Sequence, residues 1–228
     1  MRIPVKRLRV LAAWVVAMAG LSGLVSAGTV IAISGDRDGV ALPNVVIAMK
    51  PIGTAAPAAV PVTITVTQEN LQFKPYISII RKGSSVVFAN RDTVEHHIKS
   101  FSSSRPFEIA VHKPGDTPPP IRFDAEGAIV AYCILHDWMR AYVYVADTPW
   151  YSSSDLSGIA RIDNLPPGEY EITAWHPDLG QFKPPLSAKI TVPAFGSAQT
   201  SFKFEFKPRA IRQAPKNAGV KTAELYLQ

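Results

Sequence analysis

The sequence predicts an all-β protein, with a Greek-key β-sandwich and a second, smaller β-sandwich that follow an N-terminal export signal. Two observations lead to this fold class. Short segments rich in β-branched and aromatic residues recur along the chain, and turn-forming Gly, Pro, Asn and Asp separate them. In addition, no stretch after residue 27 shows the apolar periodicity of a long amphipathic helix. Regularly spaced short strands of this kind are typical of a sandwich or barrel.

The first 27 residues have the composition of a signal peptide. A basic start is followed by an apolar run over residues 10–25, and the run closes on the small residues Ser26 and Ala27. We expect cleavage after Ala27. Because the run is shorter than the ~20 residues of a membrane span, the expected mature protein is periplasmic and has no stable membrane span. Retention as an uncleaved N-terminal anchor is the alternative.

The charge distribution gives no case for nucleic-acid binding. The chain has 24 basic and 18 acidic residues, for a formal net charge of +6, and four of the basic residues lie in the predicted signal, so only +2 remains after cleavage. Much of the remaining basic character lies in residues 207–228, which form a basic C-terminal tail. Such a tail is typical of a solvated terminus; contact with an acidic partner or a membrane surface is the alternative.

A central block of strands predicts one domain over residues 62–146. Residues 62–67 alternate apolar and polar side chains, as a half-buried strand does. Further strands are predicted at residues 77–80, 84–88, 107–111, 121–123, 129–133 and 142–145. A segment rich in Ala and Pro, residues 53–61, reads as the linker that precedes this domain.

Segments on both sides of the central block predict parts of a second sandwich. Residues 28–55 read as a β-hairpin, with a Gly- and Asp-rich turn at residues 35–39. Residues 147–206 contain further predicted strands, at 158–162, 170–175, 189–192 and 200–206. One hypothesis is a single sandwich made from both segments, with the central domain inserted at a loop tip. The alternative is a hairpin packed on the central domain and an independent C-terminal domain.

The motif that carries chemistry lies around Cys133, the single cysteine of the chain. Cys133, His136 and Met139 are spaced C-x2-H-x2-M directly after an apolar strand. An inert buried thiol or an intermolecular disulfide is the alternative for a lone cysteine. A second imidazole follows a strand and a polar loop at His96, with His97 as the alternative. Two imidazoles, a thiolate and a weak thioether suit one type-1-like copper ion, so we expect His96, Cys133, His136 and Met139 to bind it.

These motifs resemble those of the cupredoxin family, over roughly residues 62–146. The strand that ends in Tyr-Cys, with His and Met shortly after it, is similar to plastocyanin, pseudoazurin and especially amicyanin. The segment FANRDTVEHHIKS resembles the family's F-x-N-x-x-x-x-x-H stretch and thereby places His96 on the ligand position. HHIKSFS and LHDWM also resemble periplasmic cupredoxin-like proteins labelled methylamine utilisation proteins. SGIARIDNLPPGEYEITAWHPDLG resembles the carboxypeptidase-regulatory-like, transthyretin-type sandwich.

The resemblance implies a one-electron carrier and not an enzyme, with a redox protein such as a cytochrome or dehydrogenase as its partner. Two alternatives stay open: a copper-binding or copper-delivery protein without a redox partner, and a structural β-sandwich adaptor with a degenerate metal site. Asn90 is expected to fix the loop before His96 by hydrogen bonds, and Asp92 and Asp137 either do likewise or lie on the surface. His112 and His176 are expected to be structural.

Overall fold

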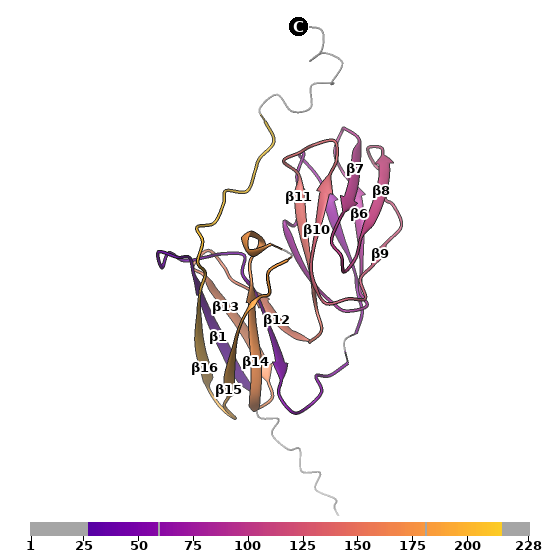
Figure 1. Ribbon diagram of the computed structural model, residues 1–228. Coiled ribbons are helices and arrows are strands. Elements are labelled where there is room, and N and C mark those ends of the chain that lie inside the picture. Colours follow the sequence, from indigo (N-terminus) through magenta and orange to yellow (C-terminus); the bar gives the residue numbers. More distant parts are fainter. Residues whose placement is uncertain (1–26, 59, 181, 216–228) are drawn as a thin grey trace, which may run out of the picture.

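The computed structural model describes residues 27–58, 60–180 and 182–215, where the chain forms sixteen strands and one short 3-10 helix. The all-β class that the sequence predicts is confirmed: four sheets form two sandwiches that lie side by side (Figure 1). The predicted signal peptide lies almost entirely outside the described residues. Within these ranges, no helix has the length and apolar character needed to cross a membrane.

The central sandwich consists of a five-stranded and a four-stranded sheet, with one apolar core between them. The first sheet contains, in spatial order, β5 (Ile77–Arg81), β11 (Arg140–Ala146), β10 (Gly127–Cys133), β7 (His96–Ser100) and β8 (Phe107–His112). The second contains β4 (Phe73–Lys74), β3 (Thr63–Gln68), β6 (Ser85–Asn90) and β9 (Ile121–Arg122). Because side chains alternate along a strand, each sheet turns fully buried residues toward the other: Val66, Val86 and Phe88 from one, Ile98, Ile129 and Val143 from the other.

The flanking sandwich takes strands from both sides of the central domain in the sequence. One sheet contains β13 (Ile159–Leu165), β1 (Gly28–Gly35) and β16 (Ser197–Lys203), and the other contains β12 (Trp150–Ser153), β2 (Val46–Pro51), β14 (Gly168–Trp175) and β15 (Leu186–Val192). β1 pairs antiparallel with β13 and parallel with β16, while β2 pairs antiparallel with β12 and β14. The 3-10 helix η1 (Pro177–Leu179) follows β14.

β1 and β2 do not form the β-hairpin that the sequence predicts for residues 28–55. The predicted turn is present, since the Asp36 carboxylate accepts hydrogen bonds from the N–H groups of Asp38 and Val40. However, β1 and β2 belong to opposite sheets. Leu42 and Val45, which follow the turn, are both fully buried in the core of this sandwich. Because these two side chains are buried between the sheets, the chain crosses from one sheet to the other after the turn. β1 and β2 therefore pair with other strands and not with each other.

The two sandwiches pack against each other through a third apolar cluster. β11 presents Tyr142 and Tyr144 on the face that points away from the central core, and these rings contact Trp175 at the end of β14. Val46 and Ala48 of β2 complete the flanking side of the contact. The two sandwiches therefore form one packed structure, and β11 contacts apolar residues on both of its faces.

Candidate metal centre

Two neighbouring strands place the first two candidate ligands. β7 begins at His96 and β10 ends at Cys133, and these strands pair with Cys133 opposite Ile98. The alternation along β7 buries His96 and Ile98. His96 therefore points into the same core region that contains Cys133.

The loop between β10 and β11 supplies His136 and Met139. The N–H group of Met139 donates to the carbonyl of His136 at 2.9 Å, and the N–H group of Cys133 donates to the carbonyl of Met139 at 3.1 Å. The loop therefore turns back tightly on the end of β10. Met139 is 1% exposed and packs in the same core cluster as Cys133.

Three ligand atoms of three different residues converge at this end of the central sandwich. The distance from Cys133 Sγ to His96 Nδ1 is 3.5 Å, and that to His136 Nδ1 is 3.3 Å. All three atoms lie within 4.8 Å of one another. His96 and Cys133 are buried, whereas His136 is only partly buried. One edge of the cluster is thus accessible from the surface through the His136 ring.

The geometry distinguishes His96 from His97, a choice that the sequence leaves open. His96 is fully buried and contributes to the cluster. His97 lies on the opposite face of β7, where its Nε2 is 2.7 Å from the Glu108 carboxylate. His97 and Lys99 together hold Glu108, which is an exposed residue of β8. His97 therefore lies outside the three-residue cluster and belongs to a surface ion-pair group.

A hydrogen-bonded loop supports His96 from behind. His96 Nε2 is 2.8 Å from the Asp92 carboxylate, which also accepts the N–H group of Leu71. Asn90 Oδ1 accepts the N–H group of Asp92, and Asn90 Nδ2 donates to the carbonyl of Val94. Asn90 therefore ties the loop down, as expected from the sequence, and Asp92 contacts a candidate ligand directly.

The Asp92 contact determines which nitrogen of His96 is free to bind a metal. When Nε2–H donates to the carboxylate, the Nδ1 lone pair is left facing Cys133. Burial lowers the pKa of His96, although Asp92 opposes this shift, and burial also lowers the pKa of His136. Burial raises the pKa of the Cys133 thiol. The imidazoles thus keep their lone pairs available, and the thiol must release its proton when a metal binds.

We expect Asp92→Asn to weaken copper binding about tenfold, the lower end of the effect typical for residues that orient a metal-bound histidine. Asparagine preserves the size of the side chain but removes the negative charge opposite His96 Nε2. Competition with a copper chelator measures the affinity. Asp124→Asn is the matched control because Asp124 is exposed and pairs with Arg122. Equal affinities for the two variants would contradict a role of Asp92 in orienting His96.

The two remaining histidines, His112 and His176, lie outside the cluster. His112 is opposite His96 in the β7–β8 pairing, with the two ring centroids 6.4 Å apart, and its Nδ1 is 3.2 Å from the Ala110 carbonyl. His176 directly precedes η1 in the flanking sandwich, where its Nδ1 accepts the N–H group of Asp178. Burial lowers the pKa of His176 to about 4. His176 is therefore a buried neutral side chain that caps η1.

Trp138 and Asp137 connect the loop between β10 and β11 to its surroundings. Trp138 Nε1–H donates to the Leu71 carbonyl at 3.0 Å, and its ring centroid is 5.3 Å from that of His136. Asp137 accepts a hydrogen bond from the guanidinium of Arg212 at 2.8 Å. This ion pair is absent from the expectations based on the sequence. The sequence shows that the two residues have opposite charges, but they are 75 positions apart, and no local sequence pattern predicts a contact over that separation.

The donor set fits copper. Two neutral imidazoles and a thiolate combine ligands that tolerate Cu(II) with a soft sulfur that favours Cu(I). Met139, buried in the same loop, would offer a soft thioether as a further, weak donor. These residues would hold a single ion, because this is the one such group of His, Cys, Asp and Glu ligand atoms found among the described residues.

Similar proteins were found among solved structures but not among protein families or curated proteins. No protein-family model matches the chain, and no curated protein matches it. Among solved structures, the chain is similar to a purple cupredoxin from Nitrosopumilus maritimus, at 25% identity over 36% of this chain and 97% of that one, with a TM-score of 0.33. It is also similar to a point mutant of amicyanin in its reduced Cu(I) form, at 18% identity over 43% of this chain and 97% of that one, with a TM-score of 0.34.

A third similar structure is the copper-containing nitrite reductase NirK from Thermus scotoductus SA-01. The identity is 24% over 42% of this chain and 25% of that chain, with a TM-score of 0.35. The three similarities each extend over about two fifths of this chain.

Proposed function

We propose that this protein is a periplasmic type-1 copper protein that carries single electrons between redox proteins. The observation that carries the proposal is the convergence of His96 Nδ1, Cys133 Sγ and His136 Nδ1 within 4.8 Å. Copper held by these atoms would alternate between Cu(I) and Cu(II), and so store one electron.

The way the chain holds the donors supports rapid electron transfer. His96 and Cys133 are fixed by neighbouring paired strands, and Asp92 fixes the ring of His96. Backbone hydrogen bonds between Cys133, His136 and Met139 keep the connecting loop closed. Donors that are fixed before the metal binds resist rearrangement when the metal changes its charge, and less rearrangement means a lower barrier to electron transfer.

The surface around His136 suits the approach of a redox partner. His136 is the partly buried member of the cluster, and the preceding residues Ile134 and Leu135 are 47% and 49% exposed. The aromatic ring of Trp138 lies beside His136. Electrons would enter and leave along the His136 ring, within an apolar surface that a cytochrome or dehydrogenase could cover. Burial of the other donors leaves little room for a substrate, which favours a carrier over an enzyme.

The test is the visible and electron paramagnetic resonance spectrum of the Cu(II)-loaded protein, followed by voltammetry. We expect one copper ion per chain, an intense visible thiolate-to-copper band, a narrow copper hyperfine splitting and a reversible one-electron wave. These features require a short bond between copper and the Cys133 thiolate in a site that both oxidation states share.

Two other results would point away from electron transfer. Bound copper with a weak visible band and rapid loss to a chelator would indicate copper delivery or storage. Absence of copper binding would contradict the proposal and leave a β-sandwich adaptor with a degenerate site.

A further inference from the structure

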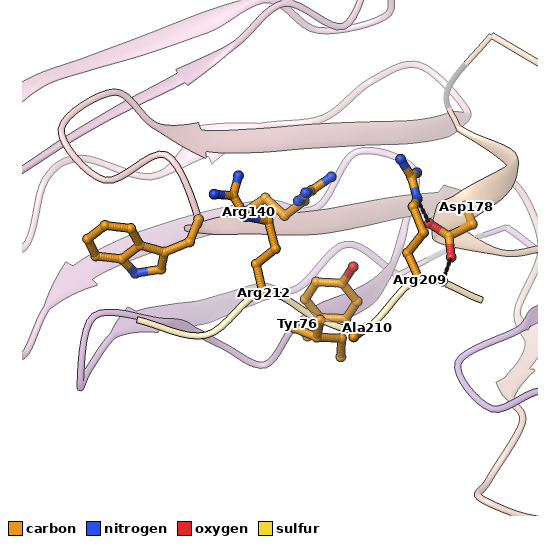
Figure 2. Close-up of a pocket in the computed structure, with 8 residues that line it drawn as sticks. Tyr76, Arg140, Asp178, Arg209, Ala210 and Arg212 are labelled. Carbon is orange, nitrogen blue, oxygen red and sulfur yellow. Dashed lines mark hydrogen bonds and ion pairs between the residues drawn. The ribbon is translucent and has the colours of Figure 1, made fainter. Parts of the chain in front are cut away.

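A small pocket lies where the C-terminal segment crosses from the flanking sandwich to the metal-binding loop. It contains about 270 Å³ of space between atoms, part of it open to solvent. Its walls come from four separate parts of the chain and are formed by Tyr76, Trp138, Arg140, Asp178 and residues 209–212 (Figure 2). None of the three clustered donor residues lines it.

Three arginines and one aspartate surround this pocket. Arg209 is paired with Asp178, since its Nε and its backbone N–H each donate to the carboxylate at 2.7 Å. Arg212 is paired with Asp137, which lies outside the pocket. Figure 2 shows the guanidinium groups of Arg140, Arg209 and Arg212 on the same side of the pocket. Each aspartate thus already has its own arginine.

Arg140 is the pocket arginine for which the described residues provide no partner. Within the described part of the chain, its guanidinium makes no hydrogen bond and no ion pair. It is the first residue of β11 and is only partly exposed, because the strand holds it against the pocket walls. A partly buried guanidinium loses some of its hydration, and pairing with an anion is the ordinary way in which a protein compensates for that loss. With two carboxylates for three guanidinium groups, the site has one positive charge in excess.

Tyr76 and Trp138, which also line the pocket, add a hydroxyl group and a flat aromatic surface. Burial raises the pKa of Tyr76, so its hydroxyl keeps its proton and can donate or accept a hydrogen bond. Trp138 closes one side. A concave surface with a net excess of positive charge attracts anionic ligands.

We propose that this pocket binds an oxyanion group, held mainly by the fork of Arg140 and assisted by Arg209 and Arg212. The planar guanidinium matches the paired oxygens of a carboxylate, sulfate or phosphate in geometry as well as in charge. The ligand has two sources with the same chemistry: a free small oxyanion, or an acidic side chain of another protein. The proposal does not rest on the proposed copper site, because none of the candidate metal donors lines the pocket.

Isothermal titration calorimetry with inorganic phosphate tests this site on the purified full chain, at an ionic strength held constant with chloride. A second titration uses a short peptide rich in glutamate. We expect one molecule of one of these probes to bind per chain. Arg140→Gln should weaken the affinity for that probe at least about tenfold, because a charge-assisted hydrogen bond contributes enough free energy for such a change. Arg212→Gln should weaken the same probe, and provides a second variant if Arg140→Gln does not fold.

The matched control is Arg161→Gln, since Arg161 is an exposed arginine of β13 that pairs with Asp163. Phosphate binding that depends on Arg140 would support a free oxyanion as the ligand, and Arg140-dependent binding of the peptide alone would support a protein carboxylate. The proposal is overturned if neither probe binds, or if Arg161→Gln weakens binding as much as Arg140→Gln and Arg212→Gln do.

Discussion

Cys133→Ser is expected to abolish the intense visible absorption of the Cu(II)-loaded protein. The same change should weaken copper binding by more than the roughly 10- to 100-fold that is typical when a residue that only supports a ligand is lost. The substitution removes the atom that both clustered imidazoles face, at 3.5 and 3.3 Å from their Nδ1 atoms. Visible spectroscopy and a chelator competition measure the two effects.

The physical reason is the difference between sulfur and oxygen at one position. When a metal binds, the Cys133 thiol can release its proton to solvent, and the resulting thiolate is a soft, polarizable anion. A serine hydroxyl of nearly the same shape keeps its proton and provides a hard oxygen. The core tolerates the exchange in size, so the variant tests the chemistry of the site more than the packing around it.

Met139→Leu is the control for this prediction. Met139 is 1% exposed, and leucine conserves its volume, which usually costs less than about 1.5 kcal/mol of folding free energy. The thiolate and both imidazoles remain, so the visible band should persist with a changed intensity. A band that survives in Cys133→Ser and disappears in Met139→Leu would contradict the proposed ligand roles of the two residues.

The candidate site was predictable from the sequence because its donors are fixed by local rules. The C-x2-H-x2-M spacing confines Cys133, His136 and Met139 to one strand end and one short loop. Strand alternation left His96 and His97 on opposite faces without deciding which face was inside. The structure settles the position of each ring, because burial of Ile98 in the central core turns His96 inward as well.

Other features depend on contacts between distant parts of the chain and were not predictable. The turn after β1 was recognised, but the assignment of β1 and β2 to one hairpin was wrong, because burial of Leu42 and Val45 is a property of the assembled sandwich. The contact of Arg212 with Asp137 likewise depends on the path of the C-terminal segment. Composition described that segment only as basic.

Trp175→Ala is expected to lower the free energy of unfolding by about 3–5 kcal/mol, the usual cost of truncating a large buried aromatic residue. Trp175 is 2% exposed, and its ring centroid is 5.6 Å from that of Tyr142 and 5.4 Å from that of Tyr144. Its Nε1–H donates to the carbonyl of Gly180 at 2.8 Å. Alanine would leave a cavity between the sandwiches and an unpaired carbonyl beside it. Urea unfolding followed by circular dichroism measures the change.

Phe195→Ala is the matched control, because Phe195 is 78% exposed and its loss should change the free energy of unfolding by no more than about 0.5 kcal/mol. A small effect of Trp175→Ala, comparable to that of the control, would mean that the sandwiches are stable independently and that their contact contributes little.

The expected large effect has a consequence for the metal site. Tyr142 and Tyr144 belong to β11, which begins directly after Met139. The flanking sandwich then helps to fix the strand on which the metal-binding loop closes, and copper retention in Trp175→Ala should fall together with stability.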